Sequence, residues 1–113
     1  MTETTIFSKI INGEIPCEKI YEDEICIAFN DISPQAPVHY LVIPRKPIVN
    51  LLSVEKEDEN LLGHLLLVGK KIAIEKNISN WRTVINTGKG SGQTVFHLHI
   101  HFLAGRPMKW PPG

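Results

Sequence analysis

The stretch His97-Leu-His-Ile-His-Phe-Leu103 holds three of the five histidines of the chain. Histidine alternates with apolar residues in it, which is typical of a β-strand because successive side chains of a strand point to opposite faces. We predict a strand from Val95 to Leu103 that carries the three histidines on one face. Its other face then presents apolar side chains to the core: Leu98, Ile100 and Phe102.

Three interpretations of the histidine face follow from residue chemistry. In the first, a neutral imidazole with a reference pKa of about 6.5 attacks phosphorus, and a neighbouring imidazolium stabilises the charge on the phosphate oxygens. In the second, the alternating histidines bind zinc. No acidic residue lies near them in the sequence to complete such a site. In the third, they are ordinary polar residues of a sheet surface, which the clustering of so uncommon a residue type disfavours.

A glycine-rich segment, Gly88-Lys-Gly-Ser-Gly-Gln-Thr94, leads into the predicted strand. Glycines allow a backbone to approach phosphate closely, and consecutive N–H groups can form an anion-binding concavity. The segment has neither the spacing of a Walker loop nor the following helix of a dinucleotide fingerprint. A flexible hairpin loop is the commoner explanation, but the neighbouring histidines favour anion binding.

One long helix is predicted over Val54–Lys76. Ser53 is its expected N-cap, acidic residues crowd its first turn, where the macrodipole favours them, and Asn77 can adopt the left-handed stop. The apolar face of this helix is wide, and the small residues Gly69 and Ala73 on it permit close packing. A face of this width indicates either a broad core surface or a second covered surface, as in a dimer.

The other predicted elements are short. A helix of one or two turns is expected over Ile6–Ile11, and strands are expected over four ranges: Glu18–Tyr21, Glu24–Phe29, Val38–Pro44 and Trp81–Asn86. Short strand connections beside one long helix indicate an α+β fold with an antiparallel sheet, not a doubly wound parallel sheet. Residues 1–113 are expected to form a single domain.

Composition excludes several classes of function. Twelve basic and twelve acidic residues give a net charge of zero, so no broad basic field is available for non-specific nucleic-acid binding. No stretch approaches the roughly 20 apolar residues of a membrane span, and the N-terminal residues lack the pattern of a secretory leader. Cys17 and Cys26 lack metal-ligand spacing and are expected to be reduced. We expect a cytoplasmic protein, with the nucleus as the alternative, that binds neither nucleic acid nor membrane.

The histidine stretch matches the pattern His-φ-His-φ-His-φ-φ, where φ is apolar, and the chain resembles the histidine triad superfamily over nearly its whole length. The likeness extends to Ile6-Phe-Ser-Lys-Ile-Ile, Phe29-Asn-Asp-Ile-Ser-Pro-Gln-Ala-Pro, His39-Tyr-Leu-Val-Ile-Pro, Leu61-Leu-Gly-His and Gly105-Arg-Pro-Met-Lys-Trp-Pro-Pro-Gly. The Trp-Pro-Pro-Gly ending is similar to that of the Hint branch and differs from that of the dinucleoside polyphosphate hydrolases.

This resemblance implies a five-stranded antiparallel sheet with one long and one short helix, joined to a second sheet across a homodimer. It also implies hydrolysis of purine nucleoside phosphoramidates, such as adenosine 5′-monophosphoramidate, and of aminoacyl adenylates through a nucleotidyl-histidine intermediate. No cofactor or metal is expected. The alternative is a dimeric nucleotide-binding regulatory module whose catalysis is incidental.

The resemblance further implies roles for single residues. His99 is the expected nucleophile, His101 contacts the phosphate, and His97 and His39 orient them. Thr94, where the branch commonly has serine, is expected to help protonate the leaving group. The expected nucleotide contacts comprise Asp31 at the ribose, Phe7, Phe29 and Ile32 at the base, and Asn86, Gly92, Gln93 and Thr94 at the phosphate. Trp110 is expected to reach the neighbouring subunit's site, whereas His64, in the middle of the predicted helix, is interpreted as structural.

Overall fold

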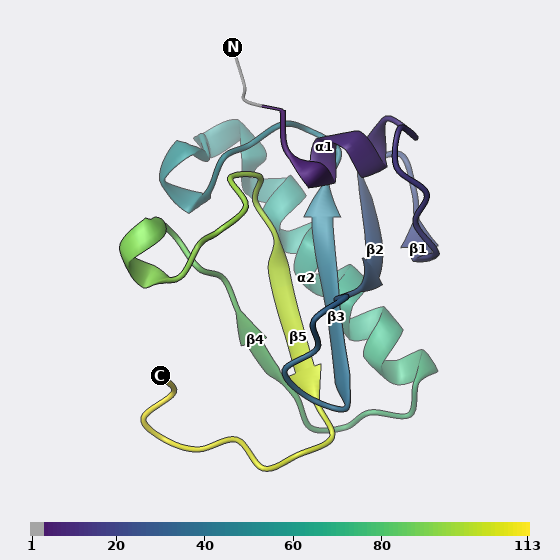
Figure 1. Ribbon diagram of the computed structural model, residues 1–113, viewed down its shortest axis with the longest axis vertical. Coiled ribbons are helices and arrows are strands. Elements are labelled where there is room, and N and C mark those ends of the chain that lie inside the picture. The colour runs from purple at the N-terminus through teal and green to yellow at the C-terminus, as the bar shows by residue number, and fades with distance from the viewer. Residues whose placement is uncertain (1–3) are drawn as a thin grey trace.

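The computed structural model describes residues 4–113 and shows one sheet packed against two helices (Figure 1). Residues 1–3, part of the stretch from which no secretory leader is expected, lie outside the described residues. The elements are α1 (Ile6–Ile11), β1 (Lys19–Glu22), β2 (Cys26–Asn30), β3 (Val38–Pro44), η1 (Leu51–Ser53), η2 (Lys56–Asp58), α2 (Glu59–Glu75), β4 (Arg82–Val84), η3 (Lys89–Ser91) and β5 (Ile100–Ala104).

The five strands follow the order β1-β2-β3-β5-β4, and every neighbouring pair is antiparallel. This confirms the predicted α+β fold with one long and one short helix. The β1–β2 hairpin turns at Asp23, whose Oδ1 accepts the backbone N–H groups of Ile25 and Cys26 at 2.7 and 2.8 Å. A short carboxylate that bonds to the backbone in this way replaces the hydrogen bonds that a tight turn removes from the ladder.

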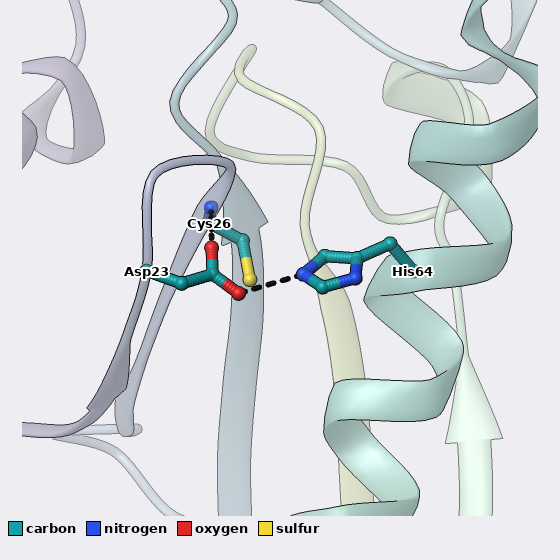
Figure 2. Close-up of side chains that lie close together, drawn as sticks. All are labelled: Asp23, Cys26 and His64. Atoms are coloured by element: carbon teal, nitrogen blue, oxygen red, sulfur yellow. Dashed lines mark hydrogen bonds and ion pairs between the residues drawn. The ribbon is translucent and has the colours of Figure 1, made fainter.

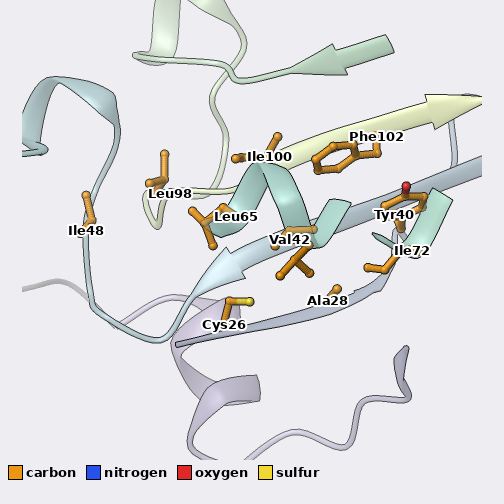
Figure 3. Packing of buried hydrophobic residues seen from close by; sticks show 11 residues of the cluster. Cys26, Ala28, Tyr40, Val42, Ile48, Leu65, Ile72, Leu98, Ile100 and Phe102 are labelled. Carbon is orange, nitrogen blue, oxygen red and sulfur yellow. The ribbon is translucent and has the colours of Figure 1, made fainter. Parts of the chain in front are cut away.

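Each face of the sheet buries a separate apolar cluster. On one face, side chains of β2, β3 and β5 pack against α2, and Leu98, Ile100 and Phe102 all belong to this cluster, as predicted (Figure 3). On the other face, Phe7 and Ile10 of α1 pack against alternate residues of β2 and β3. The histidine face is therefore the face that α1 partly covers.

Helix α2 approaches the sheet most closely at Gly69. A methyl group at this position would overlap the ring of Phe102, and the hydroxyl of Tyr40 donates a hydrogen bond to the Gly69 carbonyl at 2.8 Å. The rings of Tyr40 and Phe102 stack with centroids 5.2 Å apart, beneath the helix. The prediction that small residues permit close packing is confirmed, since Ala73 is also fully buried.

The start of the long helix was expected at Val54, but α2 begins at Glu59. Two short 3₁₀ turns precede it, and Ser53 lies inside the first of them instead of capping the helix. The buried carboxylate of Asp58 accepts the backbone N–H of Glu55 at 3.0 Å and pairs with Lys46, so these acidic residues form a turn of their own. The predicted left-handed stop at Asn77 is confirmed by its φ of 58°.

The predicted strands are correct in place and differ in length. Strand β5 begins at Ile100 instead of Val95, because the preceding chain leaves the ladder and the N–H of Leu98 bonds to the Ile48 carbonyl at 2.7 Å. Strand β4 has three residues where six were expected, and β1 and β2 each start one or two residues later than predicted. Of the three histidines, only His101 lies within a strand, although the alternation of faces continues through His97.

Within residues 4–113, no helix combines the length and the apolar character needed to cross a membrane.

Candidate active site

The imidazole of His99 is held by the backbone. Its Nδ1 lies 2.7 Å from the carbonyl oxygen of His97. Because a carbonyl only accepts, Nδ1 carries the proton and Nε2 keeps its lone pair. Burial lowers the pKa of His99 below its ordinary value of 6.5, so the ring is neutral at pH 7. A neutral imidazole with a free Nε2 is the form that acts as a nucleophile.

A backbone carbonyl also orients the imidazole of His97, through its other ring nitrogen, Nε2. Its Nε2 donates to the carbonyl of Pro44, the last residue of β3, at 2.8 Å. The side chain is buried, and burial lowers its pKa. His97 therefore ties the segment before β5 to the end of β3, and its own carbonyl is the group that orients His99.

His39 and His101 form a second pair, across β3 and β5. The N–H of Gln35 donates to Nδ1 of His39 at 3.0 Å, so the proton of His39 is on Nε2. This Nε2 lies 2.9 Å from Nδ1 of His101 and 3.4 Å from a carboxylate oxygen of Asp31. His101 accepts at Nδ1 and consequently keeps its own proton on Nε2. The pair thus presents one N–H donor next to His99, whose ring centroid is 5.0 Å from that of His101.

The charge state of His101 follows from its burial and its neighbours. Burial and the neighbouring rings of His99 and His39 lower its pKa to about 4. In the chain by itself, His101 is therefore a neutral hydrogen-bond donor at pH 7. An anionic phosphate placed beside this ring would favour the protonated form.

Phe7 of α1 closes one side of the histidine cluster. Its ring meets the His99 ring edge to face with centroids 5.0 Å apart, and it meets Phe29 in the same manner at 5.6 Å. These contacts explain how a short helix at the start of the chain desolvates a histidine near its end. Desolvation by burial, to which this packing contributes, is the largest cause of the lowered pKa of His99.

Comparison with known proteins identifies the family. A family model described as "Scavenger mRNA decapping enzyme C-term binding" matches residues 4–110. Two relatives, each named an uncharacterized HIT-like protein, align with 100% of this chain and with 100% of their own length. The one from Synechococcus elongatus is 59% identical and the one from Synechocystis sp. is 57% identical, each over an alignment of 114 positions. The chain belongs to the histidine triad (HIT) superfamily.

Solved HIT structures show the same fold. A HIT family hydrolase from Legionella pneumophila superposes with a TM-score of 0.94 at 45% identity, covering 97% of this chain and 100% of that one. A histidine triad protein from Clostridium difficile superposes with a TM-score of 0.90 at 42% identity, covering 96% and 97% of the two chains. The predicted HIT-like sheet and helices are thereby confirmed.

The glycine-rich loop of this HIT protein is closed by the side chain of Gln93. Its Oε1 accepts the N–H of Gly88 at 2.9 Å and a hydrogen bond from Asn50 at 3.1 Å. Its Nε2 donates to the carbonyls of Val49 and Val95 at 2.8 and 3.1 Å. All four hydrogen-bonding positions of this buried amide are occupied by protein, so the side chain holds the loop in shape. Asn50 was not anticipated, because nothing in a lone asparagine 43 residues upstream signals this contact.

The other predicted nucleotide contacts lie in two loops of the HIT fold, at residues 31–32 and 86–94. Gly92 adopts a left-handed φ of 92° and lies against the side chain of Asn86, and Thr94 is exposed. Ile32 is 91% exposed, beside Asp31, whose Oδ1 accepts the N–H of Ser33 at 2.8 Å. The structure therefore places Asp31 next to His39 and leaves Ile32 open to solvent.

Two residues lie away from this cluster. Trp110 is 84% exposed on a C-terminal segment that Arg82 anchors through a 2.9 Å hydrogen bond to the Lys109 carbonyl. A surface cavity of about 640 Å³ separates this segment from β4 and β5. His64 bonds to Asp23 from the other face of the sheet at 2.7 Å, in line with its expected structural role.

Proposed function

We propose that this HIT protein, as a member of the Hint branch, hydrolyses purine nucleoside phosphoramidates at their phosphorus–nitrogen bond and also hydrolyses aminoacyl adenylates. The observation that carries the proposal is the hydrogen bond from His99 Nδ1 to the His97 carbonyl, which leaves Nε2 unprotonated and ready to attack. The Trp-Pro-Pro-Gly ending supports the branch. The likeness to a Legionella protein that is named a hydrolase supports hydrolysis.

The reaction follows from these groups in two displacements. His99 Nε2 attacks phosphorus, the P–N bond breaks, and the amine leaves with the bonding electrons and takes a proton that Thr94 relays from solvent. A neutral N–H of His101 donates to a phosphate oxygen as charge develops on it. Water then attacks phosphorus and gives one proton back to solvent, the bond to Nε2 breaks, and His99 recovers its lone pair as the nucleoside monophosphate departs.

The nucleotide is bound by groups around this centre. Asp31 accepts hydrogen bonds from the ribose hydroxyls, a task suited to an ionised carboxylate. Phe7, Phe29 and Ile32 contact the base, and the exposed side chain of Ile32 offers it an apolar surface. Asn86, Gly92, Gln93 and Thr94 form the phosphate end, with Gln93 acting through the loop that its side chain holds.

The proposal includes a homodimer whose sheets join at β4. This strand is at the edge of the sheet, and an unpaired edge offers N–H and C=O groups to a second chain. Apolar side chains are also exposed on α2 and directly before β4: Leu66, Leu67, Ile74 and Trp81. In such a dimer, Trp110 extends from its exposed segment toward the partner subunit's site.

The decisive experiment compares the wild-type chain with His99→Ala on adenosine 5′-monophosphoramidate. We expect the variant to lose turnover and to retain binding of adenosine monophosphate, which also shows that it is folded. Rapid quenching into alkaline denaturant, in which a phosphorus–nitrogen bond to histidine survives, should trap a nucleotidyl adduct on the wild type alone. Turnover by His99→Ala contradicts the proposed nucleophile. Tight nucleotide binding by a wild type that hydrolyses no phosphoramidate supports the regulatory module instead.

A further inference from the structure

A second cluster of reactive side chains lies on the α2 side of the sheet, on the face opposite the histidine triad (Figure 2). Asp23 comes from the β1–β2 turn, Cys26 from the start of β2 and His64 from α2. Their carboxylate oxygen, sulfur and imidazole nitrogen all lie within 4.8 Å of one another. Three different donor types from three elements therefore converge on one point.

We propose that Asp23, Cys26 and His64 bind one zinc ion. A set of one thiolate, one imidazole and one carboxylate suits zinc, which accepts sulfur, nitrogen and oxygen ligands in a tetrahedron. Magnesium and calcium prefer sites made of oxygen alone, so this set excludes them. The proposal goes beyond the hydrolytic reaction and does not depend on it.

Three hydrogen bonds already fix the orientation of the Asp23 carboxylate, as hydrogen bonds do for carboxylate ligands in metal sites. Its Oδ1 accepts the N–H groups of Ile25 and Cys26, and its Oδ2 accepts the hydroxyl of Tyr21 at 2.8 Å. Hydrogen bonds of this kind fix the orientation of a metal ligand before the metal arrives. The turn therefore presents a preoriented oxygen to the space between the hairpin and α2.

A proton now occupies the position proposed for the metal. His64 Nε2 and Asp23 Oδ2 share it across 2.7 Å. Zinc bonds of about 2.0 Å at tetrahedral angles need a separation of about 3.3 Å between these two atoms, so a small movement of the His64 side chain is sufficient. On binding, His64 ligates through Nε2 as a neutral imidazole that carries its one proton on Nδ1, and the Cys26 thiol gives its proton to solvent. The thiolate and the carboxylate then balance the charge of the ion.

The site is accessible from one side. Cys26 is fully buried, whereas the side chains of His64 and Asp23 are 32% and 26% exposed. His64 also lines a surface cavity of about 510 Å³ together with Ile25 and Leu61. No metal was expected from the sequence, because Cys17 and Cys26 lack the spacing of a paired-cysteine metal site.

Cobalt(II) is the probe for the test, because a thiolate ligand gives it a charge-transfer absorption that histidine and carboxylate ligands do not give. We expect the reduced, chelator-treated full chain to bind one Co²⁺ at this cluster with that absorption, and zinc to displace it at one equivalent. Among the described residues, the other group of side chains spaced to hold a metal ion is Asp31, His39 and His101, which contains no cysteine, so cobalt bound there gives no such band. Cys26→Ser should abolish the band. Cys17→Ser is the matched control, because Cys17 packs on the other face of the sheet, and it should keep the band.

The outcomes that overturn the proposal are specific. A folded wild type without the thiolate band contradicts it, and so does a band that survives in Cys26→Ser. His64→Gln supplies a second variant should Cys26→Ser fail to fold. It should weaken Co²⁺ binding at least tenfold, and unchanged binding by this variant contradicts the proposed ligand set.

Discussion

His39 Nε2 and His101 Nδ1 lie 2.9 Å apart, so two histidines separated by 62 positions in the chain share one hydrogen bond. Because the Gln35 N–H occupies the other nitrogen of His39, the direction of this hydrogen bond is fixed, and His101 must present its proton outward. The backbone at Gln35 thus determines which nitrogen of His101 can donate to a phosphate.

Removal of this hydrogen bond should slow catalysis. His39→Ala leaves Nδ1 of His101 without a donor, so the proton can move there and the outward donor is lost. We expect kcat to fall by about 10²- to 10³-fold, the usual effect of losing one donor to a developing oxyanion, with a smaller change in KM. His39→Gln retains an N–H donor and should recover part of the rate. Equal rates for the alanine and glutamine variants would contradict this account.

The pH dependence of kcat/KM should show a neutral nucleophile. Burial lowers the pKa of His99 below 6.5, so the ring stays uncharged throughout the neutral range. We expect a flat profile above pH 6.5 and a decline only as the pH falls below that value, measured after correction for spontaneous hydrolysis. An acid limb with its midpoint at pH 7 or above would show that the histidine is charged in the free protein.

Acid should also reduce the free energy of unfolding. The folded-state pKa of His101, about 4, lies below the ordinary value of 6.5, so between these two values the unfolded chain binds more protons. Stability is therefore complete above pH 6.5 and is lost as the pH falls toward 4. Urea unfolding at a series of pH values measures the slope, which stays below about 1.4 kcal/mol per unit for this one partly exposed ring. His101→Gln should flatten the slope, and an unchanged slope would assign it to other groups.

Two glycines of α2 should respond oppositely to alanine. Gly69→Ala forces a methyl group into the Phe102 ring and should destabilise the fold by about 1–3 kcal/mol or more. Gly63→Ala meets no atom within 4 Å and should stabilise the fold by about 0.5–1 kcal/mol through helix propensity. Thermal unfolding of the two variants side by side checks both signs. Similar losses in both would indicate that the helix, and not the contact with Phe102, determines the effect.

Gln93 offers a test of the loop. Gln93→Glu keeps the shape of the side chain but replaces its two donors with an acceptor, which then faces the carbonyls of Val49 and Val95. Leaving such buried groups unsatisfied costs about 1–3 kcal/mol each. We expect lower stability in urea and weaker binding of adenosine monophosphate by calorimetry. Thr94→Val, at an exposed neighbouring position, should leave stability unchanged, and a nucleotide affinity unaffected by Gln93→Glu would exclude a role for the loop.

Periodic features of this fold were predictable from the sequence. Alternation from His97 to Phe102 predicted two opposed faces, and the apolar stripe with Gly69 predicted a long helix packed closely on the sheet. The start of that helix was missed, because acidic residues before Glu59 resemble a first helical turn, whereas Asp58 bonds back to Glu55 and to Lys46. Local composition does not distinguish these two arrangements.

The chemistry of the site was predictable only in part. Residue types located the histidines, but the proton positions depend on acceptors and donors that the fold brings from a distance, such as the carbonyl of Pro44, 53 residues from His97. The charge of His101 could not be predicted for the same reason, since its burial and its contact with His39 depend on a segment 62 residues away. Contacts between segments far apart in the sequence therefore determine the proton positions and charges of these histidines.

The acceptors that prepare His97 and His99 are main-chain carbonyls, those of Pro44 and of His97 itself. No codon change removes a carbonyl, so mutations of the surrounding side chains can change the pocket without altering which nitrogen of His99 is unprotonated. Substrate preference can therefore change in evolution independently of the tautomer of His99. Side chains around the site can be replaced to suit a new leaving group, while Nε2 of His99 keeps its lone pair. Only semisynthesis, exchanging a peptide unit for an ester or thioamide, reaches the feature that sets its reactivity.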